Sequence, residues 1–204
     1  ITKGFGYLLS PIWQAIFFQG TTFVVRIVLG PVAVTIFNTV RTATRAINQA
    51  NTIVINSVMP EMQYEIGANN LTKARKIFRF SFFSTILISG TGMILLYFFG
   101  LELYEIWKKN QLSPPVVMWN VFIIGILFNA IWWFSGDILL FSNKPFVFTS
   151  AAVIIALFSV LISYVLSIYF GLTGAALGSL FLDTVLVLYI LPKSLKLLGQ
   201  SMKT

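Results

Sequence analysis

Two arginines stand four residues apart in a largely apolar part of the sequence, at Arg41 and Arg45. Residues with this spacing lie on one face of a helix, and the other polar side chains on or beside that face are Asn38, Asn48, Gln49 and Thr52. Guanidinium groups bind phosphate and carboxylate oxygens through charge-assisted, often bidentate hydrogen bonds. The spacing therefore predicts a cationic stripe suited to an anionic ligand.

The depth of this stripe follows from the helix that carries it, which we expect over residues 31–59 with Pro31 at its outer end. At a rise of about 1.5 Å per residue, Arg41 lies about 15 Å and Arg45 about 21 Å along the helix, inside the hydrocarbon region of a bilayer. On insertion scales, each arginine at a helix centre makes the free energy of membrane insertion less favourable by about 2.5–3.5 kcal/mol. Ionisable groups at this depth usually line a pathway. We therefore expect Arg41, Arg45, Asn48 and Gln49 to line a cavity.

A structural role for the arginines is the alternative, because a buried carboxylate would neutralise each of them. Asp183, near the middle of its helix, and Asp137, nearer the cytoplasmic end of its helix, are the candidates for ion pairing or ion coupling. Arg26 lies close to the outer end of the first helix, where it either faces the cavity or extends to the lipid headgroups. Because the arginines outnumber these acids, we expect an excess of positive charge.

The aromatic residues admit two interpretations as well. Trp107 and Trp119 flank the predicted outer connection, where an interfacial aromatic belt is expected, and Trp132 and Trp133 lie deeper. Packing or contact with lipid is one role for the deeper pair. Stacking on a sugar ring is the other, if either of them faces the cavity.

Composition decides the class of fold that positions these side chains. Hydrophobic residues make up 57% and charged residues 10% of the 204-residue chain, whereas soluble domains have about 25% charged residues. Several apolar blocks reach the ~20 residues that cross a bilayer, and they lack the alternation of a β-barrel. We therefore predict an all-α fold in which residues 1–204 form a single bundle of six transmembrane helices, at about 4–29, 31–59, 73–100, 115–141, 145–170 and 173–191.

Basic residues flank the predicted helices unevenly. With both chain ends in the cytoplasm, the cytoplasmic segments carry nine lysines and arginines, and the opposite side carries two, Lys108 and Lys109. The positive-inside rule favours this orientation. The net charge of +8 then reflects topology. We do not expect a nucleic-acid partner, since the lysines and arginines counted here flank the predicted helices and do not form a stripe.

The chain contains no cysteine and no histidine. This excludes disulfides, thiol chemistry and acid–base catalysis by histidine. Carboxylates, arginines and aromatics are the functional groups that are left. We therefore expect a protein that is not an enzyme and that uses no cofactor or metal.

Two segments resemble motifs of a known superfamily. Residues 67–75, with the sequence GANNLTKAR, resemble the G-A-x-[ND]-x-x-x-A-R loop between the second and third helices of a lobe in the multidrug and polysaccharide exporter superfamily. Residues 41–49, with the sequence RTATRAINQ, resemble the R-T-x-x-R-x-x-x-Q pattern of its polysaccharide flippase branch. Members of this branch have two lobes, so the resemblance implies that this chain is the second lobe.

The resemblance implies a flippase that moves polyprenyl-pyrophosphate-linked oligosaccharides, the precursors of O-antigen, lipopolysaccharide or capsule, across the bacterial inner membrane by alternating access. It implies cavity roles for Arg41, Arg45 and Gln49 and none for Arg26, Asp137 or Asp183. The implied partners are the lipid-linked oligosaccharide, the membrane lipids and the other lobe.

Two alternative functions are retained. A cation-coupled multidrug exporter of the same superfamily would need an acidic cavity for cationic substrates. A polyprenyl-phosphate transferase, which is a membrane-embedded enzyme, would need clustered carboxylates or histidines near a membrane face.

Overall fold

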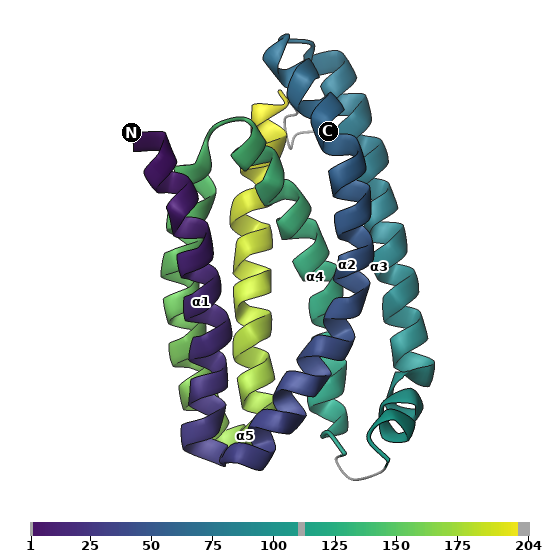
Figure 1. Cartoon of the computed structure of the whole chain (residues 1–204), viewed down its shortest axis with the longest axis vertical. Coiled ribbons are helices and arrows are strands. Elements are labelled where there is room, and N and C mark those ends of the chain that lie inside the picture. The colour runs from purple at the N-terminus through teal and green to yellow at the C-terminus, as the bar shows by residue number, and fades with distance from the viewer. Residues whose placement is uncertain (1, 110–112, 200–204) are drawn as a thin grey trace.

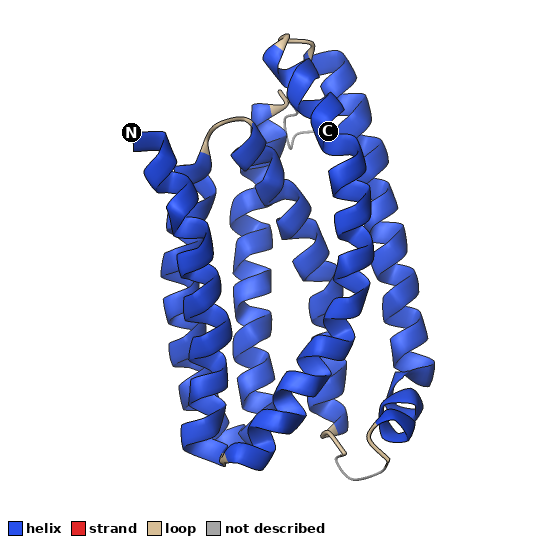
Figure 2. Cartoon of the chain, in the orientation of Figure 1, coloured by secondary structure: helices blue, strands red, loops and turns tan. Residues whose placement is uncertain are grey.

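The computed structural model describes residues 2–109 and 113–199, with side chains described from Gly4 onward. Within these residues the chain forms five helices and no strand (Figure 2). The helices are α1 (Thr2–Leu29), α2 (Pro31–Gly67), α3 (Leu71–Trp107), α4 (Val116–Phe141) and α5 (Pro145–Leu197). The all-α class is confirmed, and the predicted number of six helices is wrong.

Helix α5 accounts for the difference in number. The sequence predicts two helices separated by a break at residues 171–172, but no loop divides this segment. The chain reverses direction at Gly171, whose backbone is non-helical with φ 58° and ψ −137°, a conformation that glycine adopts without a side-chain clash. Ser159 Oγ of the first half donates to the Gly178 carbonyl of the second half over 2.7 Å. The two halves of α5 therefore lie side by side, as Figure 1 shows.

Four of the described helices, namely α1 from Gly4, α3, α4 and α5, are long and apolar enough to cross a membrane. By the length and hydropathy of these helices, the chain is a multi-pass membrane protein. Helix α2 has 37 residues and is long enough, but it falls short in hydropathy because the polar stripe with Arg41 and Arg45 lies on it. Its polar face therefore needs partners from the neighbouring helices.

Three helices extend beyond the ends predicted from the sequence. They end at Gly67 rather than 59, at Trp107 rather than 100 and at Leu197 rather than 191. In α2 the helix continues through Pro60, although proline removes one intrahelical hydrogen bond. Met59 and Met62, on either side of this proline, are buried in an apolar cluster with Phe78 of α3. Tertiary packing therefore maintains the helix where the sequence predicts its end.

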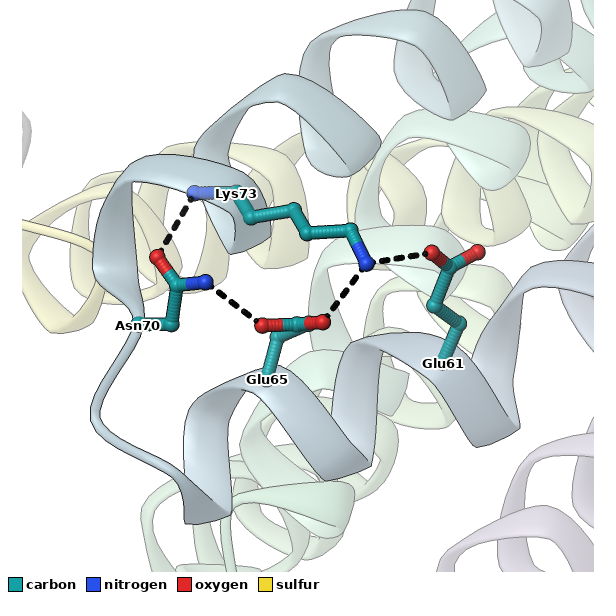
Figure 3. A network of polar contacts seen from close by, with 4 residues as sticks. All are labelled: Glu61, Glu65, Asn70 and Lys73. Carbon is teal, nitrogen blue, oxygen red and sulfur yellow. Dashed lines mark hydrogen bonds and ion pairs between the residues drawn. The ribbon is translucent and has the colours of Figure 1, made fainter.

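The turn between α2 and α3 is held by an ion-pair network (Figure 3). Lys73 Nζ lies 3.1 Å from Glu61 Oε1 and 2.7 Å from Glu65 Oε1. Asn70 Nδ2 donates to Glu65 Oε2 over 2.8 Å, and Asn70 Oδ1 accepts from the Lys73 backbone N–H over 3.4 Å. Asn70 is therefore the N-cap of α3.

The ends of the helices gather at two ends of the molecule. The N-terminus, the α2–α3 turn, the α4–α5 turn and the described C-terminal residues lie at one end (Figure 1). The α1–α2 turn and the bend of α5 lie at the other. From their shared turn, helices α1 and α2 diverge toward the end that holds the N-terminus. The candidate site is a cavity lined by residues of α1, α2 and α4.

Candidate functional site

A cavity of about 260 Å³ lies between α1, α2 and α4. Its lining comes from residues 13–18, 45–55 and 129–133. Small-molecule sites typically measure about 300–1,000 Å³, so this cavity suits one small group rather than an extended ligand. A second cavity, of about 30 Å³, adjoins it and is lined by Arg41 and Asp183, with Arg45, Asn48 and Asn129 shared between the two.

Arg41 is held by neutral groups from two helices. Its Nη1 donates to Thr21 Oγ1 over 3.0 Å and to the Phe18 carbonyl over 3.4 Å. Its Nη2 donates to Thr22 Oγ1 over 2.9 Å and to Asn38 Oδ1 over 2.6 Å. Three of these four partners lie on α1, so the bonds fix the guanidinium across the α1–α2 interface. None of them neutralises its charge.

Arg45 contacts an aromatic ring, as Arg41 also does at longer distances of 5.5 Å from Phe18 and 5.2 Å from Phe37. Its guanidinium carbon lies 3.8 Å from the centre of the Phe18 ring, within the range of a cation–π interaction. Among the residues that the structure describes, no acceptor forms a hydrogen bond with its N–H groups. Its hydrogen-bond donors are thus available at the boundary of the two cavities.

The described residues contain no ion pair between an arginine and an aspartate. In residues 2–109 and 113–199, the ion pairs are those of Lys73, and neither Arg41 nor Arg45 forms one. Asp183 is bound by neutral donors instead. Its Oδ1 accepts from Trp132 Nε1 over 2.7 Å and from Asn129 Nδ2 over 3.0 Å.

A chain of side-chain amides links Asp183 of α5 to the cavity wall on α2. Asn129 Oδ1 accepts from Asn48 Nδ2 over 2.8 Å, while Asn129 Nδ2 donates to Asp183. A carboxylate only accepts hydrogen bonds, so it fixes the orientation of both amides. The side-chain oxygen of Asn48, Oδ1, is consequently left buried, with no hydrogen-bond partner in the described part of the chain.

The aromatic wall of the cavity is also a packing cluster. The Trp13 ring of α1 lies edge-on to Trp132 and Trp133 of α4, with centroid distances of 5.6 and 6.1 Å, and contacts Phe148 of α5 at 6.0 Å. Trp13 and Trp132 are buried, and Trp133 is half-buried. The packing role expected for Trp132 and Trp133 is therefore present, and both also line the cavity.

The predicted site residues divide into two groups. The helical face brings together Arg41, Arg45, Asn48 and Gln49, and Asp183 joins them at the smaller cavity. Arg26 lies apart, exposed in the last turn of α1. Asp137 is half-buried on α4 and lines neither of these cavities.

Several lining residues were not identified from the sequence. Asn129 is one of two amides in the apolar helix α4, the other being Asn120. Trp13 and Phe18 of α1 gave no signal, since aromatic residues occur throughout the chain. Asn51 lines the cavity while its Nδ2 donates to Ser89 Oγ of α3 over 2.8 Å.

Comparisons of this chain with protein-family models, with curated proteins and with solved structures find no match.

Proposed function

We propose that this chain is one lobe of a transporter that flips polyprenyl-pyrophosphate-linked oligosaccharides across the bacterial inner membrane, with both chain ends in the cytoplasm. The observation that carries the proposal is that Arg41 and Arg45 line cavities in a membrane bundle and form no ion pair within the described residues. Arginines at a helix centre are unfavourable by about 2.5–3.5 kcal/mol each, and neither of these two forms an ion pair within the described residues. An anionic headgroup would offset this.

The contacts of the two arginines support different roles in holding a pyrophosphate. Arg45 has free N–H donors at the boundary of the two cavities and is suited to bind a phosphate oxygen directly. Arg41 is already bonded to Thr21, Thr22 and Asn38. It is suited to provide a fixed second charge, without reorganisation when the ligand binds.

The position of the cavity supports entry from the proposed cytoplasmic side. Helices α1 and α2 diverge toward the end that holds the N-terminus (Figure 1), and the charged headgroup enters between them. The polyprenyl chain stays in lipid against the apolar outer surface of the bundle, which includes Phe23 and Ile27 of α1, each more than half exposed. Rocking of this lobe against its partner lobe then opens the site to the other side.

Binding of farnesyl pyrophosphate to the chain in lipid nanodiscs tests this proposal. Loss of a charge-assisted hydrogen bond is equivalent to about 1.5–3 kcal/mol, so Arg45→Ala is expected to weaken binding about 10- to 100-fold. Arg26→Ala is the matched control, because Arg26 is exposed and lies outside the cavity. Equal affinity in the two variants, or tighter binding of a cationic dye than of the pyrophosphate, would overturn the proposal.

A further inference from the structure

Two basic residues near the start of α3 have no partner within the described residues. Lys76 and Arg79 are both exposed, and neither forms an ion pair or a side-chain hydrogen bond there. Their neighbours differ, since Lys73 is paired with two glutamates and Arg75 donates to the Leu198 carbonyl. The positive charges of Lys76 and Arg79 are therefore available to a ligand outside the bundle.

The acidic residues of the chain do not neutralise these two charges. The chain has six of them, and the two nearest in sequence, Glu61 and Glu65, contact Lys73 instead. The other four lie toward the far end of α3 or on α4 and α5, at Glu102, Glu105, Asp137 and Asp183. The first turns of α3 thus carry an excess of positive charge.

The exposed face of α3 continues from these basic residues into an apolar band. Four residues after each of them comes a phenylalanine, Phe80 or Phe83, and these two are 72% and 66% exposed. Leu87, four residues further, is 60% exposed. Residues four apart share one face of a helix and differ in depth by about 6 Å. The headgroup region of a bilayer adds about 5–7 Å to each side of the hydrocarbon core, so this interval separates the headgroup level from the core.

The two levels of this face match the two parts of an anionic phospholipid. Phosphate oxygens accept charge-assisted hydrogen bonds from a guanidinium or ammonium group, and basic residues next to a membrane span attract anionic lipids. The acyl chains then lie against Phe80, Phe83 and Leu87. A zwitterionic lipid presents the same phosphate together with a cation, which two adjacent positive charges disfavour.

We propose that the exposed face of α3 from Lys76 to Phe83 is a binding site for one anionic phospholipid. The lipid belongs to the leaflet at the end of the molecule that holds the N-terminus and the α2–α3 turn (Figure 1). This site lies outside both cavities at the arginines of α2. It is therefore independent of the pyrophosphate ligand and of the proposed function.

Quenching of a fluorescent label by brominated lipids tests the site in nanodiscs. The chain has no cysteine, so bimane on a single Leu87→Cys variant reports the lipid beside this face. Ile154→Cys is the matched reporter on α5, because Ile154 is 56% exposed and follows the exposed Lys144 by ten residues, as Leu87 follows Lys76 by eleven. Titration of brominated phosphatidylglycerol against brominated phosphatidylcholine gives the ratio of their affinities at each position.

The two reporters are expected to differ. Each basic residue near an anionic surface is equivalent to about fivefold in affinity, so the label at Leu87 is expected to show a preference for phosphatidylglycerol of about 25-fold. The label at Ile154, with Lys144 alone at the start of its helix, is expected to show about fivefold or less. Lys76→Gln combined with Arg79→Gln should abolish the preference at Leu87 and leave that at Ile154 unchanged, which also shows that the variant is folded.

A control variant separates the site from the general surface potential. Lys144→Gln combined with Lys196→Gln removes the same charge from exposed positions at the same end of the molecule, and is expected to preserve the preference at Leu87. The site is overturned if this control removes that preference as fully as the α3 variant does, or if the two reporters show equal preferences. Absence of quenching at Leu87 by either lipid would show that a protein surface covers this face of α3, which also overturns the proposal.

Discussion

Asn129 of α4 donates a hydrogen bond to Asp183 of α5 over 3.0 Å and so connects the buried carboxylate to the amide lining of the cavity. The carboxylate has no arginine partner in an ion pair within the described residues. Its bonds are to the neutral donors of Asn129 and Trp132. The hydrogen bonds that Asp183 accepts therefore require an acceptor oxygen at this position, but they do not require a negative charge.

Substitution of Asp183 separates these two properties. Asp183→Asn keeps an acceptor oxygen for Asn129 and Trp132, so thermal stability in detergent is expected to change by less than about 1 kcal/mol. Asp183→Leu strands two buried donors and is expected to destabilise the bundle by about 2–5 kcal/mol. Transport should fall in Asp183→Asn if the charge couples transport to an ion. Unchanged transport in a stable Asp183→Asn protein would remove the charge from the mechanism.

The α2–α3 turn outside the apolar spans should depend on pH through Glu65. The hydrogen bond from Lys73 holds the pKa of Glu65 below its ordinary value, which is about 4.3. A lowered folded-state pKa stabilises the turn at pH above the ordinary value, and this stabilisation is lost as the pH falls through the folded-state pKa. Amide hydrogen exchange in residues 66–74 is therefore expected to be slow at neutral pH and to lose protection as the pH falls below the ordinary pKa of a glutamate, after correction for the intrinsic rate.

A pair of variants tests the assignment to Glu65. Glu65→Gln should remove this pH dependence and leave the turn less protected at neutral pH. Glu61→Gln is the control, because the Glu61 side chain is 56% exposed and that of Glu65 is 7% exposed, and exposed ion pairs contribute little. A pH profile that is the same in Glu65→Gln and in the unmodified chain would contradict the prediction.

The sequence predicts those site residues that share one face of a single helix. It does not predict contacts between residues of two different helices. The spacing of Arg41, Arg45, Asn48 and Gln49 on a single face follows from helix periodicity alone, and these residues do line the cavities. Three of the four groups that hold Arg41 lie on α1, and no pattern within α2 indicates them. Pairing with a distant residue is a tertiary property, and the alternative of arginine–aspartate ion pairs is not found among the described residues.

The ends of helix α2 also differ in how far local sequence determines them. The predicted start of α2 at Pro31 is confirmed, because proline suits the first turn of a helix whatever the neighbouring helices do. The predicted end before Pro60 is wrong, because packing of Met59 and Met62 overrides the local preference. Asn129 is bonded to Asn48 of α2 and to Asp183 of α5, and no pattern within α4 indicates these partners.

Membrane orientation can be tested on a background without native cysteines. The nine-to-two distribution of basic residues predicts that cysteines at Asn69 and Asn143 are shielded from impermeant thiol reagents added outside. A cysteine at Lys109 should react, and so should one at Asn110, which lies outside the described residues. Labelling in the reverse pattern in intact cells would show that the chain ends face outward.

Arg41 and Arg45 should respond differently to replacement by alanine, although they share one helical face. Arg41→Ala leaves Thr21, Thr22 and Asn38 without their donor, and is expected to lower thermal stability by about 1–3 kcal/mol. Arg45→Ala breaks no side-chain hydrogen bond within the described residues. It is expected to preserve stability and to weaken pyrophosphate binding.

The double variants with Asp183→Ala decide whether an ion pair contributes. Removing one partner of a buried ion pair is unfavourable by about 3–5 kcal/mol, and removing both restores stability. Because neither arginine pairs with Asp183 in the structure, Asp183→Ala is expected not to rescue Arg41→Ala or Arg45→Ala. Membrane abundance and thermal unfolding, measured for the two single arginine variants and the two double variants, show whether stability is restored. Rescue in either double variant would identify that arginine as a structural partner of Asp183 and would contradict its role in binding an anionic headgroup.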